Sequence, residues 1–332
     1  MLYLEALVLT ACLYLLRWCY DRPEHEEEAQ QFSAVNPKLL KGHLSPFRWT
    51  WDSDKYIVSH KQPVFTPFHR RPLIPLIARG NTHAWQAVTG GSLILTGPVL
   101  VWWLTLMGAP HPLYGVLLYA LLWGVFGMLV MCPVLVDAPG TLLSLVGAGY
   151  YLQTGDGIGL VLIALLAGTV KEHAPVFMAL YAWSPLPLIG LLFTLYAEYR
   201  GTVRPTDADT IFALHHPFTH ARRFRDRYTF HHVLVSPWGV LLPLAFIHPS
   251  WQLWVTLAVA YGQLLIASDV SRLYHAAFPV VILCALQVPG LDNWWPLLLL
   301  AQWINPWQKN QFEAQPITMD RLMENVKRHA RA

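Results

Sequence analysis

The feature that most constrains this chain is a nearly continuous series of apolar runs from Ala84 to about residue 305, separated by short turns. A helix needs about 20 predominantly apolar residues to cross the hydrocarbon core of a bilayer. The chain is 55% hydrophobic and 13% charged, whereas an average soluble domain carries about 25% charged residues. The pattern therefore predicts an all-α fold, a polytopic helical bundle integral to a membrane.

The apolar runs predict about 8 to 11 membrane spans. The first run lacks the basic n-region and the small-residue cleavage site of a signal peptide, so residues 1–19 are expected to form a retained first transmembrane helix. The remaining spans are expected to form a bundle over residues 84–305. Their predicted ranges are 84–107, 112–136, 138–153, 157–170, 174–195, 232–247, 251–267, 274–290 and 293–305.

The distribution of basic residues predicts the orientation of the bundle. Arginines gather in the loop at about 198–230, and lysines and arginines gather in the tail, residues 306–332. By the positive-inside rule both segments are expected to be cytoplasmic. Counting spans back from them places the N-terminus in the cytoplasm and residues 20–83 outside. This long first exterior loop is expected to contain short amphipathic helices at the membrane interface.

Composition argues against two other functional classes. The formal net charge of +3 is too small to indicate a nucleic-acid surface. The four cysteines fall inside or at the ends of apolar runs, without the spacing of a metal site. We therefore expect neither a nucleic-acid partner nor a cysteine-bound metal.

Chemistry-bearing residues concentrate in the stretch WDSDKYIVSHKQPVFTPFHRRPLIPLIAR, residues 51–79. It contains Asp52 and Asp54, followed by Arg70 and Arg71, within a chain otherwise rich in apolar residues. Its prolines prevent a long continuous helix. The stretch is expected to lie at the membrane edge and to form the reactive face of an enzyme.

Further charged residues stand at the ends of predicted spans. Asp137 ends the third span, and Lys171 and Glu172 end the run 157–170. The span count places all three on the exterior side with Asp52. Ionisable residues beside apolar helices are costly and tend to mark functional sites. Adjacent helical residues point about 100° apart, so Lys171 and Glu172 need not pair with each other.

A fourth charged segment is SDVSRLYHAAFP, residues 268–279. Asp269 and Arg272 are spaced i, i+3, which allows an ion pair on a helix. The span count places this segment on the cytoplasmic side, opposite Asp137. It could join the same site only if one of the runs between 232 and 267 does not cross the membrane.

Together these motifs resemble a known superfamily. An acid-x-acid-x-Tyr after the first helix, PF-x-R-R-PL-x-P, VDAP at a span end, TVKE, and a late D-x-x-R followed by FP occur in this order over about residues 45–280. The arrangement resembles the bacterial membrane glycosyltransferases of the GT-C superfamily, which includes protein mannosyltransferases and lipid A aminoarabinose transferases. The resemblance implies a location in the bacterial cytoplasmic (inner) membrane.

The resemblance also implies a reaction. In that superfamily an acid of the first exterior loop is the general base, the donor is a polyprenyl-phosphate sugar, and basic side chains hold the phosphate. The base here would be Asp52 or Asp54, and no metal or other cofactor is expected. A single displacement without a covalent intermediate implies inversion of configuration at the anomeric carbon of the sugar. The residues expected to bind the donor or acceptor are Arg70, Arg71, Asp137, Lys171, Glu172, Asp269 and Arg272.

Two alternatives remain open. The sequence HHPFTH and the later His-His pair are typical of membrane di-iron oxidoreductases, because histidine is the commonest metal ligand in such clusters. These histidines are His215, His216, His220, His231 and His232. The chain could also be a non-enzymatic transporter or a structural subunit with membrane-protein partners. Neither the sugar nor the acceptor can be identified from the sequence.

Overall fold

The computed structural model describes residues 1–35, 71–122, 126, 128–131, 136–193, 237–263, 274–291 and 293–304. Within these residues every regular element is a helix, which confirms the all-α part of the prediction. The helices are α1 Leu2–Val35, α3 Leu73–Ala78, α4 Thr82–Leu106, α5 Pro112–Ala120, α6 Met128–Met131, α7 Asp137–Thr154, α8 Gly157–Val170, α9 Ala174–Ala182, η3 Leu186–Gly190, α14 Leu241–Ala245, α15 Trp251–Gly262, α17 Phe278–Leu286 and α18 Trp295–Trp303.

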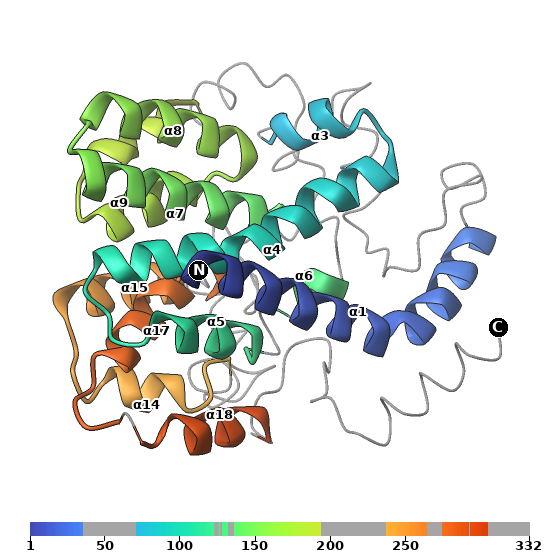
Figure 1. The fold of residues 1–332 in the computed structure, drawn as a ribbon. Helices are drawn as coiled ribbons and strands as arrows, with labels where there is room; N and C mark the ends of the chain where they lie inside the picture. The colour runs from blue at the N-terminus through green and yellow to red at the C-terminus, as the bar shows by residue number, and fades with distance from the viewer. Residues whose placement is uncertain are drawn as a thin grey trace.

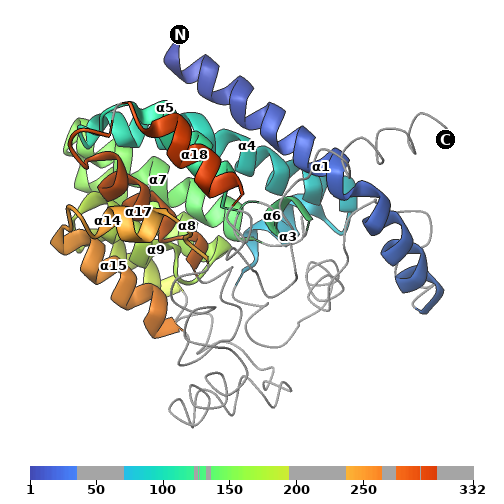
Figure 2. The ribbon, with the colours of Figure 1, turned by 90° about the horizontal axis from the view of Figure 1, so that it is seen from below.

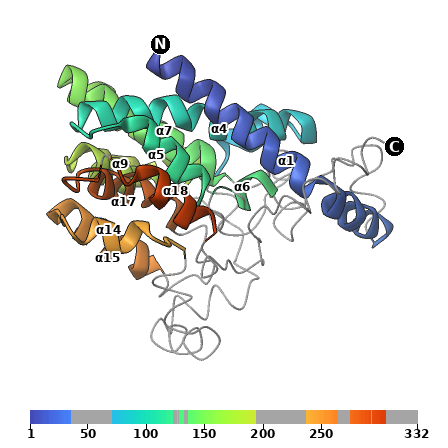
Figure 3. The ribbon, with the colours of Figure 1, turned by 60° about the horizontal axis from the view of Figure 1, so that its bottom comes forward.

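The helices form layers around a shared apolar core. In Figure 1, α8 and α9 lie with α7 on one side of α4, and α5, α14, α17 and α18 lie on the other side. Seen from below in Figure 2, α1 runs along the outside of α4 and α5, and α15 lies on the opposite face of the bundle. Figure 3 shows the same arrangement, with α17 between these two faces. The long helix α4 therefore lies between the two groups and packs against α1, α3, α5, α6 and α7.

The predicted and observed helices agree best for three of the runs. α4, α7 and α8 begin and end within two residues of the predicted ranges. In contrast, the predicted span 174–195 is divided, because Trp183 adopts a left-handed backbone conformation at the end of α9 and η3 follows. Proline favours such breaks because it lacks a backbone N–H and restricts the residue before it; here Pro185 and Pro187 flank the start of η3.

Several other predicted spans are shorter in the structure. α14 has 5 residues, α17 and α18 have 9 residues each, and the described helix within the predicted span 112–136 is divided into α5 and α6. At the other extreme, α1 continues to Val35, well beyond the predicted end at residue 19. Within the described residues, one helix, His83–Leu106, is long and apolar enough by itself to cross a membrane.

Small residues allow α1 to approach α4 closely. Thr10 of α1 is fully buried and its hydroxyl donates a hydrogen bond to the Ala6 carbonyl at 2.7 Å. This side chain lies against Gly97 of α4, where an added Cβ would overlap the Thr10 hydroxyl and lie 3.2 Å from the Ala6 carbonyl oxygen. Gly91, on the same helix, has nothing within 4 Å of an added Cβ. The two glycines therefore provide a matched test of this interface.

We expect Gly97→Ala to lower the free energy of unfolding by about 1 to 3 kcal/mol, because the added methyl group overfills the contact with Thr10. Gly91→Ala should be neutral or stabilising by up to about 1 kcal/mol, because alanine favours the helix and meets no neighbour. Unfolding of the purified protein, followed by tryptophan fluorescence, measures both changes. Equal effects of the two substitutions would show that α1 does not pack on α4 in this way.

Candidate functional site

Two ion pairs join three segments that are distant in the sequence. The Lys171 ammonium lies 2.9 Å from Asp137 Oδ1. The Arg71 guanidinium donates from Nε to Glu172 Oε2 at 2.7 Å, and from Nη2 to Glu172 Oε1. Two parallel hydrogen bonds of this kind fix the relative orientation of arginine and carboxylate. Lys171 and Glu172, although adjacent, therefore reach different partners.

The helix ends explain why these residues meet. α7 and α8 pack against each other as antiparallel neighbours, so the first turn of α7 lies beside the last turn of α8. Asp137 opens α7, where a carboxylate interacts favourably with the helix dipole. Lys171 ends α8 in an extended backbone conformation, and its ammonium group reaches Asp137 at the start of α7. Gly140, one turn after Asp137, leaves room for the lysine stem: an added Cβ would lie 3.0 Å from Lys171 Cβ.

Three of the four charged residues are removed from water. Asp137 is 1% exposed, and Arg71 and Lys171 are each 5% exposed, whereas the Glu172 side chain is 28% exposed. Burial of an isolated charge is very costly, so buried charges are normally paired. We call this arrangement of Arg71, Asp137, Lys171 and Glu172 the charge cluster. It contains four of the residues that the sequence singled out.

The charge cluster controls the protonation of the two residues that follow Lys171. Removal from water favours the neutral form of Glu172 and by itself would raise its pKa. The positive charges of Arg71 and Lys171 together have the larger effect and hold the pKa of Glu172 well below its usual range. For His173, removal from water and the nearby Lys171 lower the pKa from 6.5 to about 3. At neutral pH, Glu172 is therefore ionised and His173 is uncharged.

This protonation pattern predicts a stability that decreases in acid. Between pH 6.5 and about 3 the unfolded chain protonates His173 while the folded protein does not, so the unfolded state binds more protons and stability falls as the pH falls. Below about pH 4.5, Glu172 adds to the loss in the same direction. Thermal unfolding midpoints measured from pH 7.5 to 4 should fall, and less steeply in His173→Asn. A midpoint that rises over this range would contradict the assignment.

A buried histidine that the sequence analysis missed lies next to this cluster. His275 is 1% exposed; its Nδ1 lies 2.9 Å from the Thr141 hydroxyl and its Nε2 lies 3.0 Å from the Tyr119 hydroxyl. Thr141 is one turn beyond Asp137 on α7. The histidine belongs to the segment 268–279, for which only the charged Asp269 and Arg272 had been considered.

The position of His275 bears on the side of the segment 268–279, which the sequence left open. The span count placed this segment at the opposite side of the bundle from Asp137, unless one of the runs between 232 and 267 does not cross the membrane. In the structure His275 contacts Thr141, near the same end of α7 as Asp137. The described helices that precede this segment are short. α14 and α15 have 5 and 12 residues, so they extend about 8 and 18 Å, and the described part of the run, residues 237–263, does not contain two helices of membrane-spanning length.

The other predicted site residues lie outside the described part of the chain. They are Asp52, Asp54, Arg70, Asp269 and Arg272. The histidines of the di-iron alternative, at 215, 216, 220, 231 and 232, also lie there, as do most of the first exterior loop, the loop at about 198–230 and the tail. Among the residues that the structure does describe, no group of three or more His, Cys, Asp or Glu is placed to hold a metal ion.

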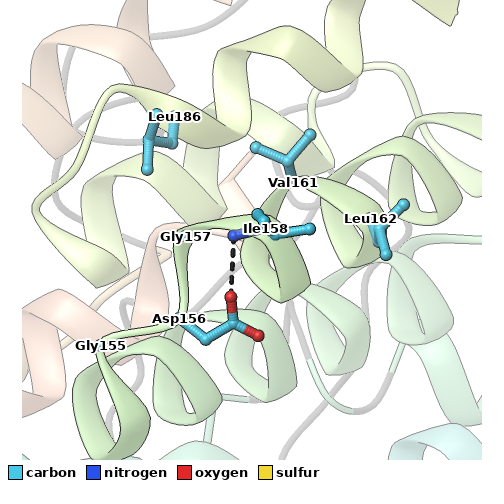
Figure 4. Close-up of a pocket in the computed structure, with 7 residues that line it drawn as sticks. All are labelled: Gly155, Asp156, Gly157, Ile158, Val161, Leu162 and Leu186. Carbon is cyan, nitrogen blue, oxygen red and sulfur yellow. Dashed lines mark hydrogen bonds between the residues drawn. The ribbon is translucent and has the colours of Figure 1, made fainter.

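A shallow apolar groove of about 600 Å³ lies at the turn between α7 and α8 (Figure 4). Its charged residue, Asp156, accepts a hydrogen bond from the Ile158 amide at 2.9 Å and another from the Tyr150 hydroxyl at 2.7 Å. These are the contacts of a helix cap. The groove is at the start of α8, about 20 Å along the helix from Lys171, so it is separate from the charge cluster.

Comparisons of this chain with models of protein families, with curated proteins and with solved structures found no match.

Proposed function

We propose that this chain is a polytopic membrane glycosyltransferase that moves a sugar from a polyprenyl-phosphate donor to an acceptor at the exterior face. Arg71 and Lys171 bind the donor phosphate, and Asp52 or Asp54 is the general base. The observation that carries the proposal is the charge cluster. Residues selected from three separate motifs, PF-x-R-R-PL, VDAP and TVKE, meet in two ion pairs at one end of the bundle.

Exposed apolar side chains support a membrane environment. Ile158, Leu162 and Leu166 form an exposed stripe along α8 at intervals of one helical turn. Soluble monomers rarely expose large contiguous apolar patches. Similar side chains are exposed on helices around the bundle: Leu4, Val8 and Leu15 of α1, Trp251, Trp254 and Val255 of α15, and Leu297 and Leu300 of α18. Such a distribution suits contact with lipid acyl chains on several sides.

Transfer of the sugar involves three changes at the reacting atoms. The acceptor hydroxyl attacks the anomeric carbon, its proton passes to a carboxylate, and the bond from that carbon to the phosphate oxygen breaks. A carboxylate partly removed from water has a raised pKa and accepts this proton more readily. The departing polyprenyl phosphate gains negative charge. Arginine and lysine stabilise that charge, arginine through paired hydrogen bonds and lysine as a point charge.

Transfer from defined donors tests the proposal. The protein is reconstituted in liposomes with radiolabelled polyprenyl-phosphate sugars, one sugar at a time, and with a membrane extract as the source of acceptor. We expect one donor to be consumed, with release of polyprenyl phosphate. Lys171→Met should abolish consumption, whereas Arg79→Met, which removes an exposed cation at the end of α3, should not. Failure to consume any donor would contradict the proposed function.

A further inference from the structure

An apolar face on α8 and η3 lies at the outer edge of the bundle. In Figure 1, α8 lies beyond α7 as seen from α4. α8 and η3 meet backbone to backbone, because an added Cβ on Gly190 of η3 would lie 2.5 Å from the Ala164 carbonyl oxygen of α8. The outward side chains of the two elements are exposed and form what we call the α8 face: Ile158, Leu162, Leu166, Leu188 and Ile189.

The composition of the α8 face suits lipid rather than a protein partner. Protein interfaces are enriched in aromatic residues and arginine and carry about 10 direct hydrogen bonds, whereas the five side chains of this face are aliphatic. The Thr169 hydroxyl, in the last turn of α8, donates a hydrogen bond to the Leu166 carbonyl at 2.7 Å. Polar groups within hydrocarbon must be satisfied internally in this way. Lipid acyl chains are therefore the occupant that the α8 face fits.

Polar residues mark both ends of the α8 face. At the first end, Asp156 caps α8 and accepts a hydrogen bond from the Tyr150 hydroxyl. Trp183, in the turn before η3, is 59% exposed, and tryptophan and tyrosine favour the membrane–water interface. At the second end, α8 reaches Lys171 and Glu172 of the charge cluster. The sequence between Asp156 and Lys171 contains no charged residue.

The distance between these two ends is short for a membrane. α8 has 14 residues, so it is about 21 Å long, whereas the hydrocarbon core of a bilayer is about 30 Å thick. Any tilt of α8 would shorten the thickness that it covers. A short apolar segment is accommodated by thinning of the bilayer or by flanking side chains that extend to the interface. The Lys171 ammonium does not extend outward, because it is buried 2.9 Å from Asp137.

We propose that the α8 face contacts lipid acyl chains over about 21 Å, and that the bilayer beside this face is thinner than its average. The inference rests on the membrane location in the proposed function, but not on the transfer reaction. It places the charge cluster at the level of the lipid headgroups on this side of the bundle. The partly exposed Glu172 would then meet water and headgroups instead of acyl chains.

The depth of spin labels along α8 tests this proposal. In the full chain, p-acetylphenylalanine replaces Ile158, Leu162 or Leu166, one at a time, and a ketone-reactive nitroxide is attached. The protein is placed in vesicles of dioleoyl phosphatidylcholine. Accessibility to oxygen, which concentrates in the bilayer interior, and to a nickel chelate, which stays in water, gives the depth of each label. Distances along α8 from the nearer of Asp156 and Lys171 predict depths of about 3, 9 and 8 Å.

Leu95, an exposed residue near the midpoint of α4, is the matched control position. α4 has 25 residues and is about 37 Å long, so it is long enough for a bilayer of average thickness. A label at Leu95 should therefore lie deeper than all three labels on α8, at about 15 Å, half of the average hydrocarbon thickness. Equal depths at Leu95 and Leu162 would overturn the local thinning.

The depth profile along α8 separates the remaining outcomes. A depth that increases steadily towards Ile158 or towards Leu166, to about 15 Å, would show a bilayer of full thickness and overturn the inference alone. Labels inaccessible to both reagents would show that protein covers the α8 face, which would also overturn it. Labels open to the nickel chelate at all three positions would overturn both the inference and the proposed membrane location. The predicted profile in a protein that transfers no sugar would contradict the proposed reaction alone.

Discussion

Replacing Asp52 by Asn should lower the rate of sugar transfer about 10²- to 10⁴-fold, the range typical of a general base. The amide keeps the shape of the side chain but cannot accept the proton of the acceptor hydroxyl. Folding and donor binding should change little, because the substitution leaves Arg71 and Lys171 in place. Single-turnover transfer in liposomes, compared with equilibrium binding of the same donor, separates the two effects.

Asp54→Asn is the matched variant, two residues away in the same loop. Loss of transfer there, with Asp52→Asn unaffected, would assign the base to Asp54. Parental rates in both single variants and in the double variant would exclude both acids of this loop as the base. The catalytic role proposed for the stretch 51–79 would then have to be abandoned.

The second large effect is expected on stability. Asp137→Asn should lower the free energy of unfolding by about 3 to 5 kcal/mol, because it leaves the Lys171 ammonium buried beside a neutral amide. Lys171→Met in the same background should recover much of that loss, since it removes the uncompensated charge. Unfolding of the four proteins of this double-mutant cycle in detergent gives the coupling energy. Additive effects, within about 0.5 kcal/mol, would show that the two residues do not form an energetic pair.

The sequence predicted the charge cluster better than it predicted the helix lengths. Acid and base residues at the ends of apolar runs marked Asp137, Lys171 and Glu172, because charges beside apolar helices require partners. The divergence of neighbouring helical residues also indicated that Lys171 and Glu172 need not pair with each other. The identity of their partners depends on how α7 and α8 pack and on where the chain before α3 lies. Those are tertiary relations without a local signal.

The role of His275 could not be predicted either. His275 contacts Tyr119 and Thr141, which are 156 and 134 residues away in the sequence, so its role as a buried hydrogen-bonding residue depends on the packing of α5, α7 and α17.

The helix break after α9 had a local signal in Pro185 and Pro187, which the hydropathy count did not use. The break within the predicted span 112–136 occurs inside an apolar run, where hydropathy alone predicts continuity. A count of apolar runs left the side of the segment 268–279 open, because it does not distinguish short helices from spans. The contact with Thr141 places His275 near the same end of α7 as Asp137.

The most direct test of the account is whether the charge cluster binds polyprenyl phosphate. Native mass spectrometry of the purified protein, titrated with this lipid, compares the parent with Asp137→Asn/Lys171→Met, in which the buried pair is neutral but similar in shape, and with the exposed control Arg79→Met. The account predicts binding about 10- to 150-fold weaker in the neutral-pair variant, which corresponds to a lost charged hydrogen bond of about 1.5 to 3 kcal/mol, and unchanged binding in Arg79→Met. Equal binding by all three proteins would contradict it.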